Sequence, residues 1–471
     1  MYRSRLGKYT RRQFLHTSAT AALVGSSGML SGCASNQYAE SGIGRVVVIG
    51  AGIAGISAAN ALQRAGYGVV VLEGSNRVGG RIHTDRSLGV PIELGAARIR
   101  GMKKNPITPY AELAKIEYRP FEWSNLSGAS SDGVEIDRDR LSKARSSLFR
   151  MVARAVIRNL GRKKDATVAE IIQHERDLKN LTQEEEHILN FSLASAEIAS
   201  GSPFAQASWK NLRDYEAYSG PEQMVINGFD ALPKLLSEFL DVRFKTTVKA
   251  IDYSGDEIRV VTDNTTFTAD YVVVTVSLGV LQAKGIEFVP ELPEHKQRAI
   301  GRMGMGNVNK IGLRFPEIFW PIDSHALVHG SDTIGEFSSF INIARYTWEP
   351  VLLAMIPESY RDALEGVPDE TVVREAYAVL QGMYGSRIPA PTQVVRSEWK
   401  ADPLFRGATS YNKIGALSED RDDLAQSVDR KLFFAGEATH RKKYGSVGGA
   451  YVTGQRAMRD ILQATTLPKM T

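Results

Sequence analysis

Cysteine is nearly absent from this sequence, because Cys33 is the only one among 471 residues. A single cysteine cannot form an internal disulfide, so the stability of the fold must come from its core and from any ligand that it binds. The eight histidines show no spacing typical of metal ligands. No constellation of His, Cys and Asp suggests a catalytic nucleophile. We therefore expect neither a disulfide scaffold nor a metal site.

An excess of positive charge is present only at the N-terminus. The whole chain carries a formal charge of +5, and five basic residues with no acidic residue precede Cys33, so the remainder is formally neutral. These basic residues are Arg3, Arg5, Lys8, Arg11 and Arg12. The sequence shows no basic stripe of the kind that binds nucleic acid, and we expect no nucleic acid partner.

The N-terminal segment is typical of an export signal and not of a folded domain. Thr10-Arg11-Arg12-Gln13-Phe14-Leu15 has a twin-arginine pattern, and the apolar stretch 19–30 that follows is too short to span a membrane. Leu30-Ser31-Gly32-Cys33 resembles a bacterial lipobox, in which the cysteine receives a lipid.

We expect residues 1–32 to be this signal and residues 33–43 to be a tether that begins at the lipid on Cys33. Twin-arginine export carries folded proteins, which suits a chain that acquires a cofactor before it leaves the cytoplasm. The lipid would be the only attachment to a bacterial membrane, with the folded part in the periplasm or another extracytoplasmic space.

A dinucleotide-binding pattern begins directly after the tether. The apolar run 46–49 precedes Gly50-Ala51-Gly52-Ile53-Ala54-Gly55, and Glu73 closes the next apolar run, residues 69–72. Gly50 permits a tight turn, Gly52 lets the backbone approach a pyrophosphate, and Gly55 lets the helix that starts there pack against the strand. Glu73 is placed to accept hydrogen bonds from a ribose.

Two further segments make the pattern specific. Arg77-Val78-Gly79-Gly80-Arg81 follows the acidic residue, and Leu432-Phe433-Phe434-Ala435-Gly436-Glu437-Ala438-Thr439 stands near the C-terminus. With them the chain resembles the flavin-containing amine oxidases, which include monoamine, polyamine and L-amino acid oxidases, over roughly residues 44 to 465. An NAD-binding Rossmann domain is the rival interpretation, and the two flanking segments argue against it.

The resemblance implies a bound FAD. Ala408 stands where monoamine oxidases carry the cysteine that links the flavin, so the FAD is expected to be noncovalent. The expected FAD contacts are Gly50, Gly52, Ala54, Gly55, Glu73, Arg77, Gly80, Arg81, Gly95, Ala96, Ala97, Arg98, Val248, Gly436, Glu437 and Val447.

The predicted fold class is α/β, with a discontinuous Rossmann-like FAD-binding domain, a mixed α+β substrate domain and a helical insertion. The FAD-binding domain is expected from residues 44–104, 225–285 and 428–468, and the substrate domain from residues 105–224 and 286–427. The helical part is expected at about 138–200, where Thr182-Gln183-Glu184-Glu185 forms a capping box ahead of a helical apolar pattern. Strand signals at 248–251, 258–261 and 265–267 predict a meander, and the run 271–276 predicts a buried strand of the parallel sheet.

Lys310 is the expected catalytic residue. The segment from Met303 to Ile311 resembles the family's glycine, asparagine and lysine motif, whose lysine holds a water against the flavin. Flanking apolar residues predict that the amine is partly desolvated, which lowers the pKa of a lysine.

Arg98 is the most informative residue for the substrate. L-amino acid oxidases carry an arginine at this position, where it binds the substrate carboxylate, whereas polyamine oxidases carry Trp and His at the positions of Arg98 and Arg100. A guanidinium pairs with a carboxylate and repels a polycation. Alternatively, Arg98 contacts only the flavin or a core carboxylate.

The positions of the monoamine oxidase aromatic cage fall at Thr409 and Ser446, neither of which is aromatic. Trp399 and Tyr411 are then the nearest candidates for aromatic lining, and core packing explains either equally well.

These observations predict FAD-dependent oxidative deamination of a primary amine, with an L-amino acid as the first choice. The products would be a 2-oxo acid, ammonia and, with oxygen as the electron acceptor, hydrogen peroxide; another redox acceptor stays open. The alternatives are a polyamine or monoamine oxidase, a flavin-binding protein without turnover, and a related flavoenzyme such as a desaturase.

Overall fold

The computed structural model describes residues 43–466, except residues 124, 137, 159–163 and 179. The expected signal, the lipid site at Cys33 and almost all of the tether lie outside the described residues. Within the described part, no helix combines the length and the apolar composition that a membrane span requires.

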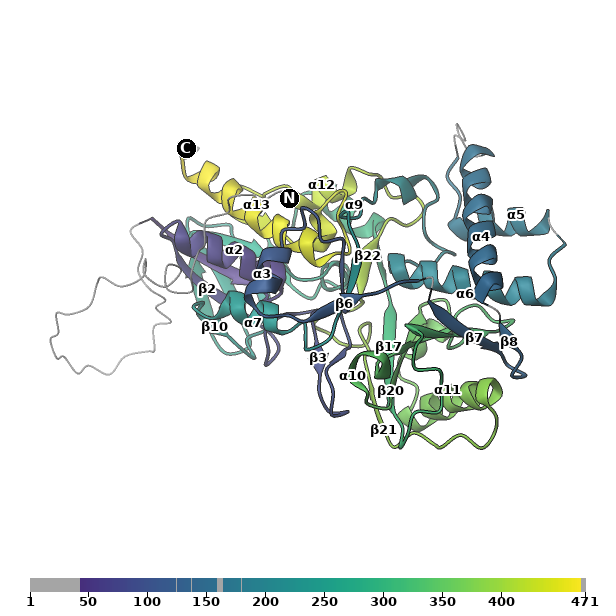
Figure 1. The fold of residues 1–471 in the computed structure, drawn as a ribbon. Coiled ribbons are helices and arrows are strands. Elements are labelled where there is room, and N and C mark those ends of the chain that lie inside the picture. Colours follow the sequence, from purple (N-terminus) through teal and green to yellow (C-terminus); the bar gives the residue numbers. More distant parts are fainter. Residues whose placement is uncertain (1–42, 124, 137, 159–163, 179, 467–471) are drawn as a thin grey trace, which may run out of the picture. The chain divides into compact units, whose positions relative to one another are not determined.

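A five-stranded parallel sheet forms the nucleotide-binding side of the molecule (Figure 1). Its strands, in spatial order, are β10 (Val242–Arg243), β2 (Gly68–Leu72), β1 (Arg45–Ile49), β14 (Tyr271–Val274) and β23 (Leu432–Phe434). Both faces of the central strands are buried, which explains why their sequences are continuous apolar runs and not alternating patterns. Three distant stretches of the chain therefore meet in one sheet.

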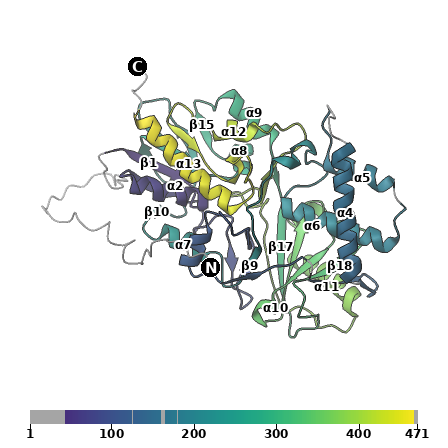
Figure 2. The ribbon, with the colours of Figure 1, turned by 45° about the horizontal axis from the view of Figure 1, so that its top comes forward.

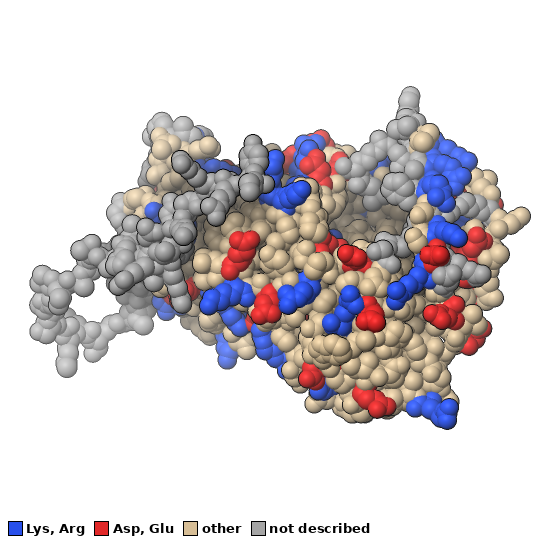
Figure 3. Space-filling view, viewed as in Figure 1, with Lys and Arg blue, Asp and Glu red and all other residues tan. Residues whose placement is uncertain are grey.

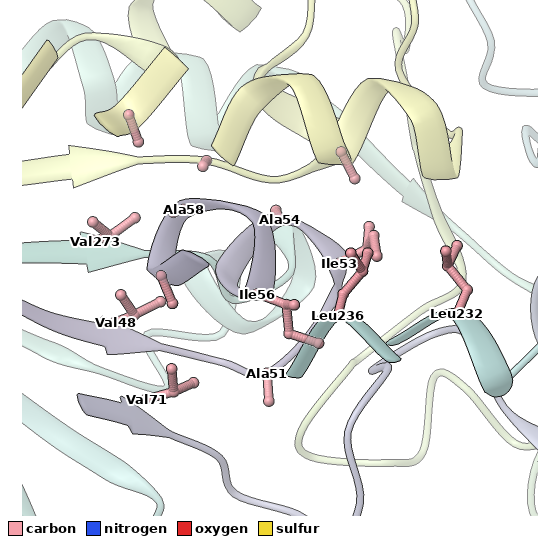
Figure 4. Close-up of a cluster of buried hydrophobic side chains, with 14 of the residues drawn as sticks. Val48, Ala51, Ile53, Ala54, Ile56, Ala58, Val71, Leu232, Leu236 and Val273 are labelled. Atoms are coloured by element: carbon pink, nitrogen blue, oxygen red, sulfur yellow. The ribbon is translucent and has the colours of Figure 1, made fainter. Parts of the chain in front are cut away.

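Helix α2 (Ile53–Arg64) packs its apolar side on this sheet. Figure 4 shows Ile56 and Ala58 of the helix beside Val48, Val71 and Val273 of three neighbouring strands. The helix begins at Ile53, two residues before the start that the glycine pattern predicted, so Gly55 lies in its first turn.

The C-terminal helix α13 (Val447–Thr466) lies along α2, as Figures 1 and 2 show. The two helices approach closely because a Cβ at Gly454 of α13 would lie 2.2 Å from the carbonyl oxygen of Ala54. The glycine at this position therefore allows the last segment of the chain to close over the first.

A four-stranded sheet stands beside the parallel one. Its order is β13 (Thr266–Ala269), β12 (Ile258–Thr262), β11 (Val248–Asp252) and β15 (Glu287–Val289). The predicted meander is thus present, and the chain then returns to the parallel sheet through β14, which ends at Val274, two residues before the predicted end. Val248, at the start of β11, is buried in the core between the two sheets.

A seven-stranded sheet organises the second region. Its order is β21 (Gln393–Arg396), β17 (Val308–Arg314), β20 (Val351–Pro357), β19 (Ser339–Asn342), β18 (Ala326–Gly330), β7 (Leu126–Ser130) and β8 (Glu135–Ile136). Smaller sheets pair β3 (Thr84–Asp85) with β4 (Ile92–Glu93), β16 (Gly304–Gly306) with β22 (Thr409–Tyr411), and β9 (Glu222–Val225) with β5 (Arg98–Arg100) and β6 (Tyr118–Pro120).

The helical part contains α4 (Arg138–Arg158), α5 (Val168–Asp177) and α6 (Gln183–Ser200). Thr182 caps α6 in the predicted capping box with Glu185, and Thr167 and Glu170 form a second one at α5. The remaining helices are α3 (Thr108–Leu113), α7 (Ala231–Ser237), α8 (Leu278–Gln282), α9 (Glu294–Arg302), α10 (Ala344–Thr347), α11 (Asp369–Tyr384) and α12 (Asp420–Ala425), with short 3-10 helices at Lys210–Asp214, Arg361–Leu364 and Glu437–Thr439. The predicted fold class is confirmed by these elements and by the structural comparison below; the domain boundaries stay a prediction.

Candidate active site

A cavity of about 550 Å³ lies between the carboxyl ends of the parallel strands and the seven-stranded sheet. Ile49, Leu72 and Thr275 line it from one side and Lys310 and Met355 from the other. Eighteen of the predicted site residues line this cavity together: Gly50, Gly52, Ala54, Glu73, Gly80, Arg81, Gly95, Ala96, Ala97, Arg98, Val248, Lys310, Trp399, Thr409, Gly436, Glu437, Ser446 and Val447.

The glycine turn forms one end of the cavity. Gly50 has a φ of +100°, which only glycine adopts without strain, and a Cβ at Gly52 would meet no atom within 4 Å. Open space at Gly52, directly before α2, is what a pyrophosphate needs in order to reach the N–H groups of the first helical turn. The turn therefore fits a dinucleotide such as FAD.

Glu73 fixes this turn and faces the same cavity. One carboxylate oxygen accepts a hydrogen bond from the N–H of Ala51 at 2.7 Å, and the other accepts one from Ser75 at 2.9 Å. Each carboxylate oxygen can accept a second hydrogen bond, so the predicted contact with ribose hydroxyls is compatible with both.

Arg81 and Glu437, which both line the cavity, connect the N-terminal and the C-terminal FAD-binding segments. A nitrogen of Arg81 donates to a carboxylate oxygen of Glu437 at 2.9 Å and to the carbonyl of Ala408 at 2.8 Å. Burial alone would raise the pKa of Glu437, but the charges of Arg81 and Arg421 together with the hydroxyl of Ser410 hold it below its usual range. Glu437 is thus a buried carboxylate that positions Arg81.

Lys310 lies on β17 and is 5% exposed. Its amine donates to the carbonyl oxygens of Glu93 at 2.8 Å and Gly95 at 2.5 Å. Burial lowers the pKa of Lys310, and the nearby carboxylate of Glu93 opposes this shift. A neutral amine has two N–H donors, which match the two carbonyls, and keeps its lone pair for a water in the cavity.

Arg98 is the most buried arginine at the cavity, with a side chain that is 7% exposed. Its guanidinium lies about 5 Å from the ring centroids of Phe121 (5.0 Å) and Trp123 (5.2 Å). One terminal nitrogen, Nη1, is 3.3 Å from a carboxylate oxygen of Glu222, but the two do not form a hydrogen bond, and Nη1 has no other hydrogen-bond partner among the described residues. Burial lowers the pKa of Arg98 to about 10, and Glu222 opposes the shift, so the guanidinium stays charged at neutral pH.

Three predicted site residues do not line the cavity. Gly55 acts through packing, because a Cβ there would lie 2.0 Å from the carbonyl oxygen of Gly50. Arg77 donates to the carbonyl of Ile82 at 3.1 Å behind the glycine segment. The ring of Tyr411 lies over Gly304, its partner in the β16–β22 ladder, and its hydroxyl donates to Gln206 at 3.0 Å.

Three charged residues that the sequence analysis did not select belong to the site. Glu93 and Glu222 neighbour Lys310 and Arg98, and Arg421 lies fully buried against the ring of Tyr444. Glu93 stands two residues before Gly95, an expected FAD contact, and could have been found from that position. No pattern in the sequence pointed to Glu222 or Arg421, because their roles arise from strand pairing and helix packing.

The described residues contain no group of three or more His, Cys, Asp or Glu side chains suited to hold a metal ion. The features of the cavity that fit a cofactor are the glycine turn and Glu73, and both fit a dinucleotide.

Comparisons with known proteins agree with this geometry. A family described as "Flavin containing amine oxidoreductase" matches residues 53–462. The chain is 32% identical over 437 residues to "Lysine-specific histone demethylase 1 homolog 2" of Arabidopsis thaliana, a match that covers 89% of this chain and 58% of the relative. It is 34% identical over 444 residues to "Polyamine oxidase 2" of the same plant, covering 88% of this chain and 87% of that protein.

The chain spans a little over half the length of the histone demethylases that it matches. Among solved structures, a putrescine oxidase double mutant with redesigned cofactor binding is similar with a TM-score of 0.71 over 89% of this chain and 99% of that one. At 19% identity this similarity supports the fold alone.

Proposed function

The chain belongs to the flavin-containing amine oxidoreductases and uses FAD, and we propose that its substrate is an amine that carries a carboxylate, first of all an L-amino acid. The observation that carries this proposal is Arg98, a buried and charged residue in the wall of the cavity whose Nη1 has no hydrogen-bond partner among the described residues. A guanidinium has five N–H donors, so Arg98 could donate to a substrate carboxylate while Glu222 stays beside it at 3.3 Å.

The FAD, when bound, takes up the hydrogen and the electron pair removed from the carbon beside the nitrogen. The side chains of this protein then have to bind the substrate, orient it and exclude water from the reacting carbon. Arg98 would fix the carboxylate and thereby the orientation of the Cα–H bond. Lys310 would hold a water through its lone pair, and the product imine would be hydrolysed by water to a 2-oxo acid and ammonia.

Oxygen as acceptor, giving hydrogen peroxide, is part of the proposal. Electron transfer to another redox partner is the alternative, and a comparison of oxygen with artificial acceptors distinguishes the two.

A polyamine or diamine oxidase is the second candidate, supported by the relatives named above and by the carboxylate of Glu222, which could attract a distant ammonium group. This carboxylate is already engaged, however. It lies 3.3 Å from Arg98 and 3.8 Å from Arg100, and it accepts a hydrogen bond from Trp123 at 3.2 Å. A polyamine would have to displace two guanidinium groups, which disfavours a polycation at this position.

The test compares amino acids with the amines that remain after loss of their carboxylate. The holoenzyme is assayed for peroxide and for reduction of an artificial acceptor with leucine against isoamylamine and lysine against cadaverine. We expect the amino acid of each pair to have the higher kcat/KM. Higher kcat/KM for both amines would refute the carboxylate proposal and favour the second candidate.

We further propose that the protein is exported by the twin-arginine route and anchored through a lipid on Cys33, on the basis of the N-terminal motifs. Changing Arg11 and Arg12 to lysine should leave folded, yellow enzyme in the cytoplasm, and Cys33→Ala should leave a precursor without lipid. A native protein that fractionates as soluble with an intact N-terminus would exclude this location.

A further inference from the structure

A second cavity of about 920 Å³ adjoins the first one. Arg98, Arg100, Ala199, Tyr215 and Tyr218 line both cavities, so a substrate held at Arg98 extends from one into the other. We call the second one the outer cavity. Its lining comes from β5, β9, α4 and α6 together with the segment around residues 215–220.

The outer cavity is strongly basic. Among the described residues that line it are four arginines, Arg98, Arg100, Arg138 and Arg150, and one carboxylate, Glu222. The sequence suggested no basic stripe, but α4 carries seven basic residues and one acidic residue, and Figure 3 shows blue side chains gathered over this helix. A positive field in a concave surface attracts anions and repels polycations.

One face of α4 forms the wall opposite the strands. Arg138, Ser142, Ser146 and Arg150 follow each other at intervals of four residues, and all four line the outer cavity. Such a series runs along one side of a helix, and twelve residues rise about 18 Å, so the two arginines stand well apart. This wall can therefore contact a group that lies beyond the one bound at Arg98.

Two buried polar atoms at this cavity lack a partner. These are Nη1 of Arg98 and the hydroxyl oxygen of Ser195, and neither has a hydrogen-bond partner among the described residues. Buried donors without acceptors are costly and rare in folded proteins. Both atoms are donors of residues in the cavity wall, which suits a ligand that carries acceptor oxygens.

We infer that the outer cavity is a second anion-binding site, which selects substrates that bear a further carboxylate beyond the one at Arg98. This inference rests on the proposed function and narrows its substrate class to acidic amino acids. Arg98 would bind the carboxylate beside the reacting amine, while the second carboxylate would lie in the positive field of the α4 wall, to which Arg138 and Arg150 both contribute. Since both of these arginines are exposed, their effect should depend strongly on salt.

The test compares L-glutamate with L-glutamine, which have almost the same shape and differ by one charge. We expect kcat/KM to favour glutamate, and Arg150→Met to reduce the glutamate-to-glutamine ratio by about 2- to 5-fold, as is typical for one exposed ion pair. Arg154→Met is the matched control, because Arg154 is exposed on the same helix but does not line the outer cavity. Raising the ionic strength from about 0.01 M to about 1 M, which shortens the screening length from about 30 Å to about 3 Å, should also reduce the ratio.

A binding measurement separates this inference from the proposed function. Glutarate, which has two carboxylates and no amine, is titrated into oxidised holoenzyme and followed through the flavin absorbance, with butyrate as the monocarboxylate control. Tighter binding of glutarate that weakens in Arg150→Met supports the second site even if amines prove to be the better substrates. Equal use of glutamate and glutamine, together with equal binding of glutarate and butyrate, would overturn the inference while oxidation of amino acids still stands.

Discussion

Replacing Lys310 by methionine should impair flavin reduction and leave the protein folded and yellow. Methionine keeps an apolar side chain of similar length and removes the amine that donates to the carbonyls of Glu93 and Gly95. Each carbonyl left without a donor costs about 1 to 3 kcal/mol, and removal of a buried, poorly solvated amine offsets part of this loss. The loss of a positioned water or general base typically lowers a rate about 10²- to 10⁴-fold, or about 2.7 to 5.4 kcal/mol in activation free energy.

Lys296 offers a matched control. It is fully buried, its amine donates to the carbonyls of Asp423, Leu424 and Gln426 at 2.7 to 2.9 Å, and it does not line the cavity. Lys296→Met removes a similar buried amine and should lower the free energy of unfolding at least as much as Lys310→Met, because three carbonyls lose their donor. Its flavin half-reactions should match those of the wild type.

Stopped-flow absorbance under anaerobic conditions measures reduction by substrate, and mixing of the reduced enzyme with oxygen measures reoxidation. Burial lowers the pKa of Lys310, so a limb of the pH–rate profile that rises with pH should appear below the usual lysine value of 10.5 and vanish in Lys310→Met. Because Glu93 titrates with Lys310, the apparent pKa belongs to the pair. The reasoning fails if both half-reactions of Lys310→Met match the wild type, or if Lys296→Met loses as much rate.

Acid precipitation of the purified protein should release all FAD into the supernatant, because Ala408 stands at the linkage position; flavin retained in the pellet would refute noncovalent binding. Gly55→Ala should lower FAD affinity and the melting temperature, because the new Cβ would lie 2.0 Å from the carbonyl oxygen of Gly50. Gly301→Ala in α9 is the control. No atom lies within 4 Å of its new Cβ, so it should raise the melting temperature slightly. Burial alone would raise the pKa of Asp230, but hydrogen bonds and ion pairs with Arg86 and Lys234 lower it from 3.8 to about 2. The ionised carboxylate therefore adds to the free energy of unfolding in full above pH 3.8, the pKa in the unfolded chain. This contribution disappears as the pH falls towards 2. Denaturant titrations of wild type and Asp230→Asn should therefore differ at pH 6 and approach each other as the pH falls from about 4 to about 2; a difference that does not change with pH would contradict this assignment.

The sequence was sufficient to predict the nucleotide-binding half of the site. The glycine turn, Glu73, Arg81 and the Gly436–Glu437 pair lie in short segments whose conformation depends on local chemistry, above all on glycine where the backbone turns or another atom comes close. Continuous apolar runs likewise predicted the central strands, because strands covered on both faces tolerate only apolar side chains. These features recur in any chain that binds a dinucleotide in this way, and so they can be recognised without a structure.

Short sequence motifs were a poor guide to the side chains that contact each other across the site. Tyr411 was a candidate for substrate contact, but pairing of β16 with β22 places its ring over Gly304 and outside the cavity. Glu222 had no motif, and only the antiparallel pairing of β5 with β9 brings its carboxylate beside Arg98 and Arg100.

The sequence by itself determined the family resemblance, the FAD-binding segments and the importance of Lys310 and Arg98 as residue types. The tertiary structure decided their surroundings: two backbone carbonyls for Lys310, and a carboxylate and two aromatic rings for Arg98. It also placed one face of α4 opposite these strands and so created the outer cavity. The physical reason is that backbone turns follow from nearest neighbours, whereas burial, pKa and charge complementarity depend on groups more than a hundred residues apart in the chain, such as Arg98 and Glu222.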